Sequence, residues 1–220
     1  MAIQLRVWGD YALFTRAELK VEKVSYPVMT PSAARGILDA IYYHPGLRWV
    51  VDRITVLKPI RYTNIRRNEM KSKILASSVR SVMMGNPKPL YINRGEDIQQ
   101  RAAMVLKDVA YVIDAHFIMT DRANPSDNPG KFQDIMRRRI EKGKCFTQPY
   151  LGVREFPAHF AHFQEGEQPD ASLRKEQDLG YMLFDMDYTD PEDIRPLFFR
   201  AALRDGVLEV PSRNSGEVRG

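Results

Sequence analysis

The sequence predicts an α+β protein with a ferredoxin-like βαββαβ domain and a small C-terminal antiparallel β-sheet unit. Three observations support this class. An alternating apolar strand opens the chain and leads to a well-capped helix. Two segments rich in β-branched and aromatic residues follow and predict a hairpin. A long alternating segment near residue 110 predicts another strand, so the order is strand, helix, strand, strand, uncertain helix, strand.

The first strand is expected over Ile3–Gly9, where the odd positions are apolar and form one buried face. The next helix begins at Thr30, a good N-cap residue, with a proline at the first helical position. Pro45-Gly46 ends it. Its apolar residues share one helical face, which predicts contact with a sheet: Ala34, Ile37, Leu38 and Ile41.

Trp49–Leu57 and Ile60–Ile65 are expected to form the hairpin. Residues 70–104 are ambiguous, with a proline-containing loop at Asn86–Pro89 and short helices expected on either side. Val105–Thr120 predicts a long strand whose odd positions face the core. Its even positions lie on the opposite face: Ala110, Val112, Asp114, His116 and Ile118.

The polar, turn-rich segment Asp121–Gly130 predicts a boundary between two domains, residues 1–122 and 123–220. A basic helix is expected near Lys131–Lys142. The small β-unit is expected to use short strands around Tyr150–Phe156, Tyr181–Met186 and Gly206–Pro211.

Length and composition indicate an ordinary globular protein. A chain of 220 residues suits one large domain or two small ones, and 44% of its residues are hydrophobic. No run of about 18 apolar residues predicts a membrane span. The N-terminus lacks the pattern of a signal peptide. The single cysteine, Cys145, cannot form an intrachain disulfide, which fits a cytoplasmic location.

Charge is distributed unevenly along the chain. Residues 164–193 carry ten acids and two bases, a net charge of −8. The whole chain carries +5, so the remaining residues carry +13. This asymmetry indicates an anionic partner for the body of the chain, although many proteins with a high pI bind no nucleic acid.

The segment Lys58–Arg80 has many cations, one acid and interleaved polar and aromatic residues. Arginine binds phosphate with two hydrogen bonds, and an aromatic ring can stack on an unpaired base. The alternative is a solvated hairpin tip. A second cluster of cations includes the consecutive arginines Arg137, Arg138 and Arg139 on the predicted helix. Consecutive residues spread around a helix, so part of this cluster is expected to be solvated. The residues expected to bind RNA here are Arg61, Arg66, Arg67, Lys71, Lys73, Arg137 and Arg138.

Two residues are candidates for proton transfer or substrate positioning. Tyr42 lies at the edge of the apolar stripe, on the same helical side as Arg35 and Asp39, and the pattern alone favours a tyrosine that caps the core. His116 is of the type that transfers protons near neutral pH, although a lone strand histidine is more often structural.

No metal or cofactor site is predicted. His159 and His162 are three residues apart, but two ligands are too few for a metal site and a loop is expected there. Phosphate-loop, zinc-ligand and Ser-His-Asp patterns are absent from the sequence.

Several blocks, taken in order, resemble the Cas-five family of CRISPR-associated proteins, d subtype, which belongs to the type I-C system. The resemblance is weaker over the acidic C-terminal part. It implies a repeat-associated RAMP fold with an RNA-recognition-type ferredoxin-like domain. The blocks are Gly9–Phe14, Ser25–Pro27, Ile41-Tyr42, Leu57–Ile60, Leu106–Val109, Ala115–Phe117 and Leu151–Glu155.

The resemblance implies an endoribonuclease that cuts the CRISPR precursor RNA near the base of the repeat hairpin. Such a protein then stays in the surveillance complex with the other subunits. The family's site of tyrosine, lysine and histidine maps onto Tyr42 and His116, and Arg35 is expected to contact RNA beside them. The lysine position is occupied by Ala115. Lys107 or a hairpin arginine is the expected replacement.

The chemistry expected is metal-independent. The 2′-hydroxyl attacks the adjacent phosphorus, which needs a base, an acid and a cation. The main alternative is a non-catalytic subunit that only holds the 5′ handle of the guide RNA. Binding of duplex DNA as an accessory protein is a third reading, which the charge allows but no motif supports.

Overall fold

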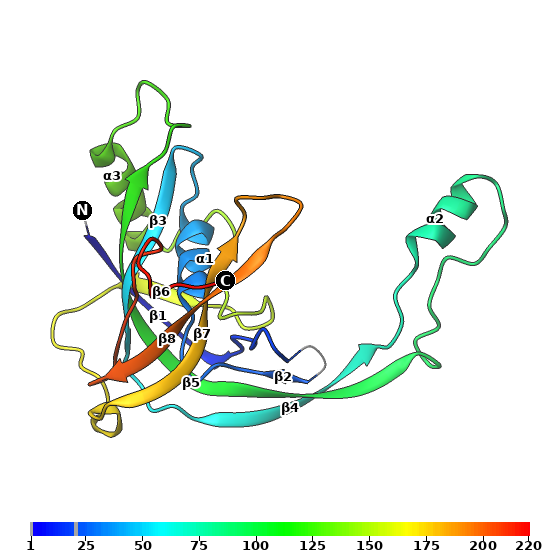
Figure 1. Ribbon diagram of the computed structural model, residues 1–220, viewed down its shortest axis with the longest axis horizontal. Coiled ribbons are helices and arrows are strands. Elements are labelled where there is room, and N and C mark those ends of the chain that lie inside the picture. Colours follow the sequence, from blue (N-terminus) through cyan, green and yellow to red (C-terminus); the bar gives the residue numbers. More distant parts are fainter. Residues whose placement is uncertain (1, 20–21) are drawn as a thin grey trace. The chain divides into compact units, whose positions relative to one another are not determined.

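The computed structural model describes residues 2–19 and 22–220. Over this part of the chain it is a mixed α/β structure with a nine-stranded sheet and few helices (Figure 1). The strands are β1 (Ala2–Ala12), β2 (Lys23–Val24), β3 (Leu47–Val56), β4 (Tyr62–Met70), β5 (Ile98–Met119), β6 (His159–His162), β7 (Gln177–Asp187), β8 (Arg195–Arg204) and β9 (Val207–Glu209). The helices are α1 (Pro31–Ile41), α2 (Ala76–Met83), α3 (Pro129–Glu141) and the short 3-10 helix η1 (Ala171–Leu173).

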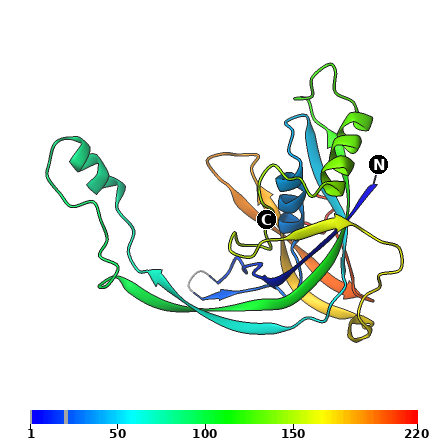
Figure 2. The ribbon, with the colours of Figure 1, turned by 180° about the vertical axis from the view of Figure 1, so that it is seen from behind.

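The strands lie in the order β6-β1-β5-β3-β9-β8-β7, and β2 and β4 pair with β5 outside this path. The pairs β1–β5, β1–β6, β3–β5, β3–β9, β7–β8 and β8–β9 are antiparallel. Helix α1 contacts β3 and β7, and α3 contacts β6 and α1, so the two helices lie side by side (Figure 2). An antiparallel sheet can keep its other face open to solvent.

The chain divides into two compact units. One comprises Met1–Thr63 and Met104–Gly220, and the other is Asn64–Ala103. This division differs from the expected boundary at residue 122. Strands from both sides of that residue belong to one sheet, since β9 pairs with β3 and β6 pairs with β1.

The first strand and helix are confirmed. Leu5 and Val7 of β1 are buried. In α1, Thr30 is the N-cap and its hydroxyl accepts a hydrogen bond from the Ala33 backbone N–H at 3.3 Å. The four apolar residues of the predicted stripe are all buried. Capping and one-sided burial together explain why the helix forms here.

Strand β5 is longer than expected, because it begins at Ile98. Its odd positions from Val109 to Phe117 are buried as predicted, whereas Met119 is 36% exposed. The even positions are not all exposed to solvent, since Ala110, Val112 and Asp114 are also buried. His116 keeps partial access to solvent on that even face.

The hairpin expected over residues 49–65 is wrong. Both segments are strands, but β3 and β4 each pair with β5 at different places along it. The backbone N–H of Leu57 donates to Ala110, and that of Lys107 donates to Arg61. The chain therefore passes through Lys58-Pro59 without reversing its direction, and β4 follows β3 along the same neighbouring strand, β5.

The strand expected at Tyr150–Phe156 is also absent from the structure, which has turns there. Gly152 has a φ of +88°, and a Cβ at this position would lie 2.0 Å from the carbonyl oxygen of Leu13. The backbone N–H of Leu13 donates to the carbonyl of Leu151 at 3.0 Å. Glycine is required for this close approach, which ties the segment to the end of β1. The predicted strand Tyr181–Met186 lies within β7, and the predicted strand Gly206–Pro211 contains the shorter β9, whereas β6 and β8 were not predicted.

Stability is expected to fall in acid. Side-chain hydrogen bonds from Ser172, Arg200 and Thr189 are the largest causes that hold the pKa values of three aspartates below the ordinary 3.8: Asp170, Asp178 and Asp187. The unfolded chain therefore binds more protons in acid, and stability rises with pH. Their contribution is complete above pH 3.8 and is lost as the pH falls through the lower folded values.

Urea unfolding between about pH 5 and about pH 2 measures this effect. Asp178→Asn should lose less stability over this range than the unmodified protein. Asp121→Asn, at an exposed turn, is the matched control. If both variants follow the unmodified protein, hydrogen bonding of Asp178 does not contribute.

Candidate active site on the β3–β5 sheet face

His116 is paired with a carboxylate that the sequence did not single out. Its Nδ1 lies 2.8 Å from both carboxylate oxygens of Asp52. A carboxylate only accepts hydrogen bonds, so Nδ1 is the donor, and in the neutral imidazole Nε2 then carries the lone pair. The two side chains are 37% and 44% exposed. The arrangement gives a partly exposed imidazole whose tautomer is set by Asp52.

A β-bulge aims Asp52 at His116. Val51 pairs with Ala115 and Arg53 pairs with Asp114, so Asp52 is the extra residue in β3. A bulge re-aims the side chains of its strand and is common beside active sites. Without a structure, plain alternation would not have brought Asp52 and Arg53 to the same face.

Asp114, on the same face of β5 as His116, is bound by two other side chains. One of its oxygens accepts a hydrogen bond from the Gln4 amide at 2.7 Å, and the other lies 3.4 Å from Nε of Arg53. The guanidinium of Arg53 remains half exposed. It is a cation on the same sheet face as His116, and sequence reasoning did not select it.

Tyr42 lies on the other side of the sheet. Its ring packs edge-on against Phe132, which packs in the same way against Phe117. Arg139 lies over the Tyr42 ring, 5.3 Å from its centre. Burial, then the charge of Asp127, raises the pKa of Tyr42, so its hydroxyl stays protonated.

The expected joint site of Tyr42 and His116 is therefore not assembled in this structure. Phe117 follows His116 in β5, and successive strand side chains point to opposite faces. Tyr42 belongs to the face covered by α1 and α3, and His116 belongs to the opposite face. The apolar pattern had favoured this core-capping role for Tyr42.

Of the expected replacements for the family lysine, Lys107 is too distant. Ala115 is fully buried and points away from His116. Lys107 lies nine residues from His116 along β5, which is about 30 Å of strand. The cations near His116 come instead from β3, namely Arg48 and Arg53.

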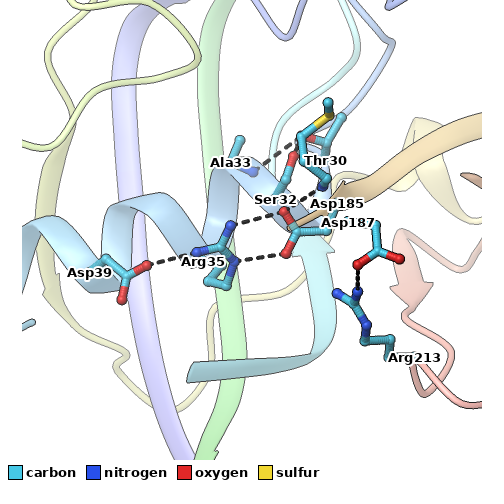
Figure 3. Close-up of polar contacts among 9 residues, drawn as sticks. Thr30, Ser32, Ala33, Arg35, Asp39, Asp185, Asp187 and Arg213 are labelled. Atoms are coloured by element: carbon cyan, nitrogen blue, oxygen red, sulfur yellow. Dashed lines mark hydrogen bonds and ion pairs between the residues drawn. The ribbon is translucent and has the colours of Figure 1, made fainter. Parts of the chain in front are cut away.

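Arg35 is bound by two carboxylates from different elements (Figure 3). Its Nε and Nη2 donate to the two oxygens of Asp185 at 2.9 Å, and Nη1 donates to Asp39 at 2.9 Å. Burial raises the pKa of Asp39. This bidentate pair joins α1 to β7 and occupies the donors that were expected to contact RNA.

The unit Asn64–Ala103 carries exposed cations. Strand β4 alternates between exposed and half-buried residues, so Arg66 is exposed and Arg67 faces the other side. Lys71 and Lys73 are exposed, and so is Arg61, which directly precedes β4 and belongs to the other unit. Most of the dense charge predicted from the sequence is thus exposed to solvent, whereas Arg67 lies on the half-buried face of β4.

The arginines of α3 diverge, as predicted. Arg137 pairs with Asp134 at 3.3 Å, and Nε of Arg138 donates to the Asp134 carbonyl at 3.2 Å. Both stay exposed. Arg139 turns inward and donates to the carbonyl of Ile41 at 2.8 Å.

The two closely spaced histidines lie in β6 and not in a loop. Three residues apart on a strand, they point to opposite faces, and His159 stacks on Trp8. Among residues 2–19 and 22–220, no three His, Cys, Asp or Glu side chains gather where they could hold a metal ion. Within the same ranges, no helix has the length and apolar character needed to cross a membrane.

Two curated proteins are similar over nearly their whole length. One, from Mannheimia succiniciproducens, is 50% identical over 222 residues, covering 99% of this chain and 98% of that protein. The other, from Thermus thermophilus, is 40% identical over 233 residues, covering 98% and 94%. Both are named CRISPR pre-crRNA endoribonuclease Cas5d.

Two solved structures share the fold. A crystal structure of a CRISPR-associated protein has a TM-score of 0.72 at 24% identity, covering all of this chain and 97% of the other. A chain of a CRISPR RNA-guided surveillance complex has a TM-score of 0.52 at 12% identity, covering 96% and 92%. The Cas5d family model, described as CRISPR-associated protein (Cas_Cas5), matches residues 2–211. This chain therefore belongs to the Cas5d family of CRISPR-associated proteins.

Proposed function

We propose that this chain is an endoribonuclease that cleaves CRISPR precursor RNA within the repeat and then stays in the type I-C surveillance complex. The observation that carries the proposal is 50% identity, over nearly the full length, to a protein named for that activity. The paired His116 and Asp52 on an accessible sheet face support it with a group suited to proton transfer.

The reaction proposed is attack by the 2′-hydroxyl oxygen on the adjacent phosphorus. Nε2 of His116 takes the hydroxyl proton, the new P–O2′ bond forms and the P–O5′ bond breaks. The 5′-oxygen leaves with a proton from the imidazolium or from water. The products are a 2′,3′-cyclic phosphate and a 5′-hydroxyl, and Arg53 stabilises the charge on the phosphorane.

Asp52 and Tyr42 have indirect roles in this proposal: Asp52 sets the tautomer of His116, and Tyr42 packs against neighbouring side chains. The carboxylate keeps the proton on Nδ1, so that Nε2 remains a base. Tyr42 holds the end of α1 against Phe132, and its carbonyl accepts a hydrogen bond from the Trp49 indole at 3.0 Å. In this proposal Tyr42 positions β3, which carries Asp52 and Arg53, and does not touch the scissile phosphate.

Cleavage is expected to persist in EDTA, because a base, an acid and a guanidinium suffice for this reaction. The assay uses purified protein at a concentration equal to that of its own repeat RNA. The ends of the fragments are read by phosphatase and kinase treatment. Complete loss of cleavage on chelation, or a 5′-phosphate on the downstream product, would contradict the mechanism.

A second candidate is a non-catalytic subunit that holds the 5′ handle of the guide RNA. The observation in its favour is Ala115, which is fully buried where the family resemblance implies a lysine. The same EDTA assay separates the two. Tight binding of the repeat RNA with no cleavage at stoichiometric protein would select the second candidate.

We also propose a ferredoxin-like arrangement for the part of the sheet that carries His116. In support, the four strands β6-β1-β5-β3 are antiparallel neighbours, with α1 and α3 in contact. In this assignment α3, and not a helix within residues 70–104, is the second helix of the βαββαβ pattern. A cytoplasmic location is proposed as well, which the single cysteine fits.

A further inference from the structure

A cavity of about 450 Å³ opens beside the edge of β3. Its wall includes Arg48–Val51, on the side of β3 that faces away from β5. Strand β9 pairs with β3 only at Arg53–Thr55, so this part of the edge is not covered by that strand. Helix α1, the end of β7 and the segment after β9 supply the other walls. The volume is in the usual range for a ligand pocket.

Ion pairs hold these walls in place. Arg35 joins α1 to β7 through Asp185 and also binds Asp39 (Figure 3). The segment after β9 is tied to the end of β7, since Arg213 donates to Asp187 at 2.6 Å. The cavity is therefore preformed, which reduces the entropy that a ligand must lose on binding.

The cavity combines aromatic and apolar surface with one unpaired cation. Phe184 is half buried, and Tyr188 is 61% exposed. Val50, Val51 and Val210 add apolar surface. Arg48 is exposed and forms no ion pair within residues 2–19 and 22–220, whereas the other two arginines of the wall are paired with carboxylates.

The cavity is next to the candidate active site. Val50 lies directly opposite His116 in the β3–β5 ladder. Directly paired residues have Cα atoms about 5 Å apart, and Asp52 is two residues further along β3. An RNA strand with its scissile phosphate at His116 would bring a neighbouring nucleotide to this cavity.

We propose that the cavity binds one unpaired nucleotide of the repeat RNA, adjacent to the cleaved bond. Its base stacks on Tyr188, and its phosphate binds Arg48. Unpaired bases are recognised by aromatic stacking, and a guanidinium that lacks a protein partner is free to bind phosphate. This inference rests on the proposed function, and it identifies a site that selects the nucleotide beside the cut.

The test is a double-mutant cycle between protein and RNA. The probe is the protein's own repeat RNA with a 2′-deoxy nucleotide at the cut position, so that it binds but is not cleaved. A series of such RNAs carries an abasic site at each unpaired position in turn. Tyr188→Ala should weaken binding of the intact probe about 10-fold, the scale of one stacked base. It should have no effect on the RNA that lacks the recognised base.

Matched variants separate this site from general effects. Tyr181→Ala removes an exposed tyrosine of β7, the strand that precedes Tyr188, and this side chain does not line the cavity. This variant should bind every probe normally. Arg48→Ala should lower the slope of log affinity against log salt by about 0.7, as for one phosphate contact. The proposal is overturned if Tyr188→Ala weakens all probes equally or none of them. It is also overturned if that variant binds RNA normally but no longer assembles with the other subunits, which would make the cavity a protein-docking site.

Cleavage of the all-ribose RNA is measured separately with the unmodified protein. A protein that does not cleave but shows the coupling between Tyr188 and one base would refute the proposed activity and keep the nucleotide site. A protein that cleaves and shows no coupling would refute the nucleotide site alone.

Discussion

Replacing His116 with alanine is expected to slow RNA cleavage by about 10²-fold to 10⁴-fold, the usual contribution of a general acid or base. The imidazole is accessible, and its Nδ1 donates to Asp52 at 2.8 Å. Affinity for the non-cleavable repeat RNA should change little, because the substitution removes a proton-transfer group and leaves the exposed cations in place. Single-turnover rates and equilibrium binding on the same RNA measure the two effects.

Asp52→Asn gives the matching test of the dyad. An asparagine at this position cannot enforce a protonated Nδ1, so Nε2 is no longer the preferred base. Loss of the carboxylate that sets the tautomer of a general-base histidine can lower kcat by up to about 10⁴-fold. The pH profile of the cleavage rate should also change, which a loss of packing alone would not cause.

His162→Ala is the control, since this histidine is exposed on β6 and lies outside the β3–β5 pair. It should cleave at the unmodified rate. If His116→Ala is as active as this control, His116 is a structural residue and the active site lies elsewhere.

Removing three cations from the unit Asn64–Ala103 is expected to reduce the salt dependence of RNA binding. Arg66, Lys71 and Lys73 are all exposed. Residues 64–103 contain eight bases and three acids, a net charge of +5 that equals the charge of the whole chain. Changing all three residues to alanine should lower the slope of log affinity against log salt by about 2, at about 0.7 per phosphate contact.

A triple variant on β8 is the charge-matched control. Arg195, Arg200 and Arg204 are exposed, and each is paired with an acid. Their removal should leave the slope nearly unchanged. Arg66→Glu should weaken binding more than Arg67→Glu, because β4 alternation exposes Arg66 and half buries Arg67. Equal slopes for both triple variants would mean that the cations of β4 and the following segment are only solvated.

The elements that could be predicted from the chain alone are those with local causes. Thr30 and Pro31 start α1, and the apolar stripe of that helix shows which face is buried. Alternation in β1 and β5 showed which residues point to the core and left His116 on the other face. Ordered sequence blocks also sufficed to identify the family.

Which of these residues come into contact depends on the folded arrangement and could not be predicted from the chain. Asp52 reaches His116 because a bulge shifts the register of β3 against β5, and no local pattern in the chain specifies that shift. Arg35 is neutralised by Asp185, which is 150 residues away along the sequence. Tyr42 and His116 were separated because α1 covers one face of the sheet and His116 belongs to the other. Strand pairing and the packing of a helix on a sheet depend on contacts between distant segments, whereas propensity and periodicity describe only the segment itself.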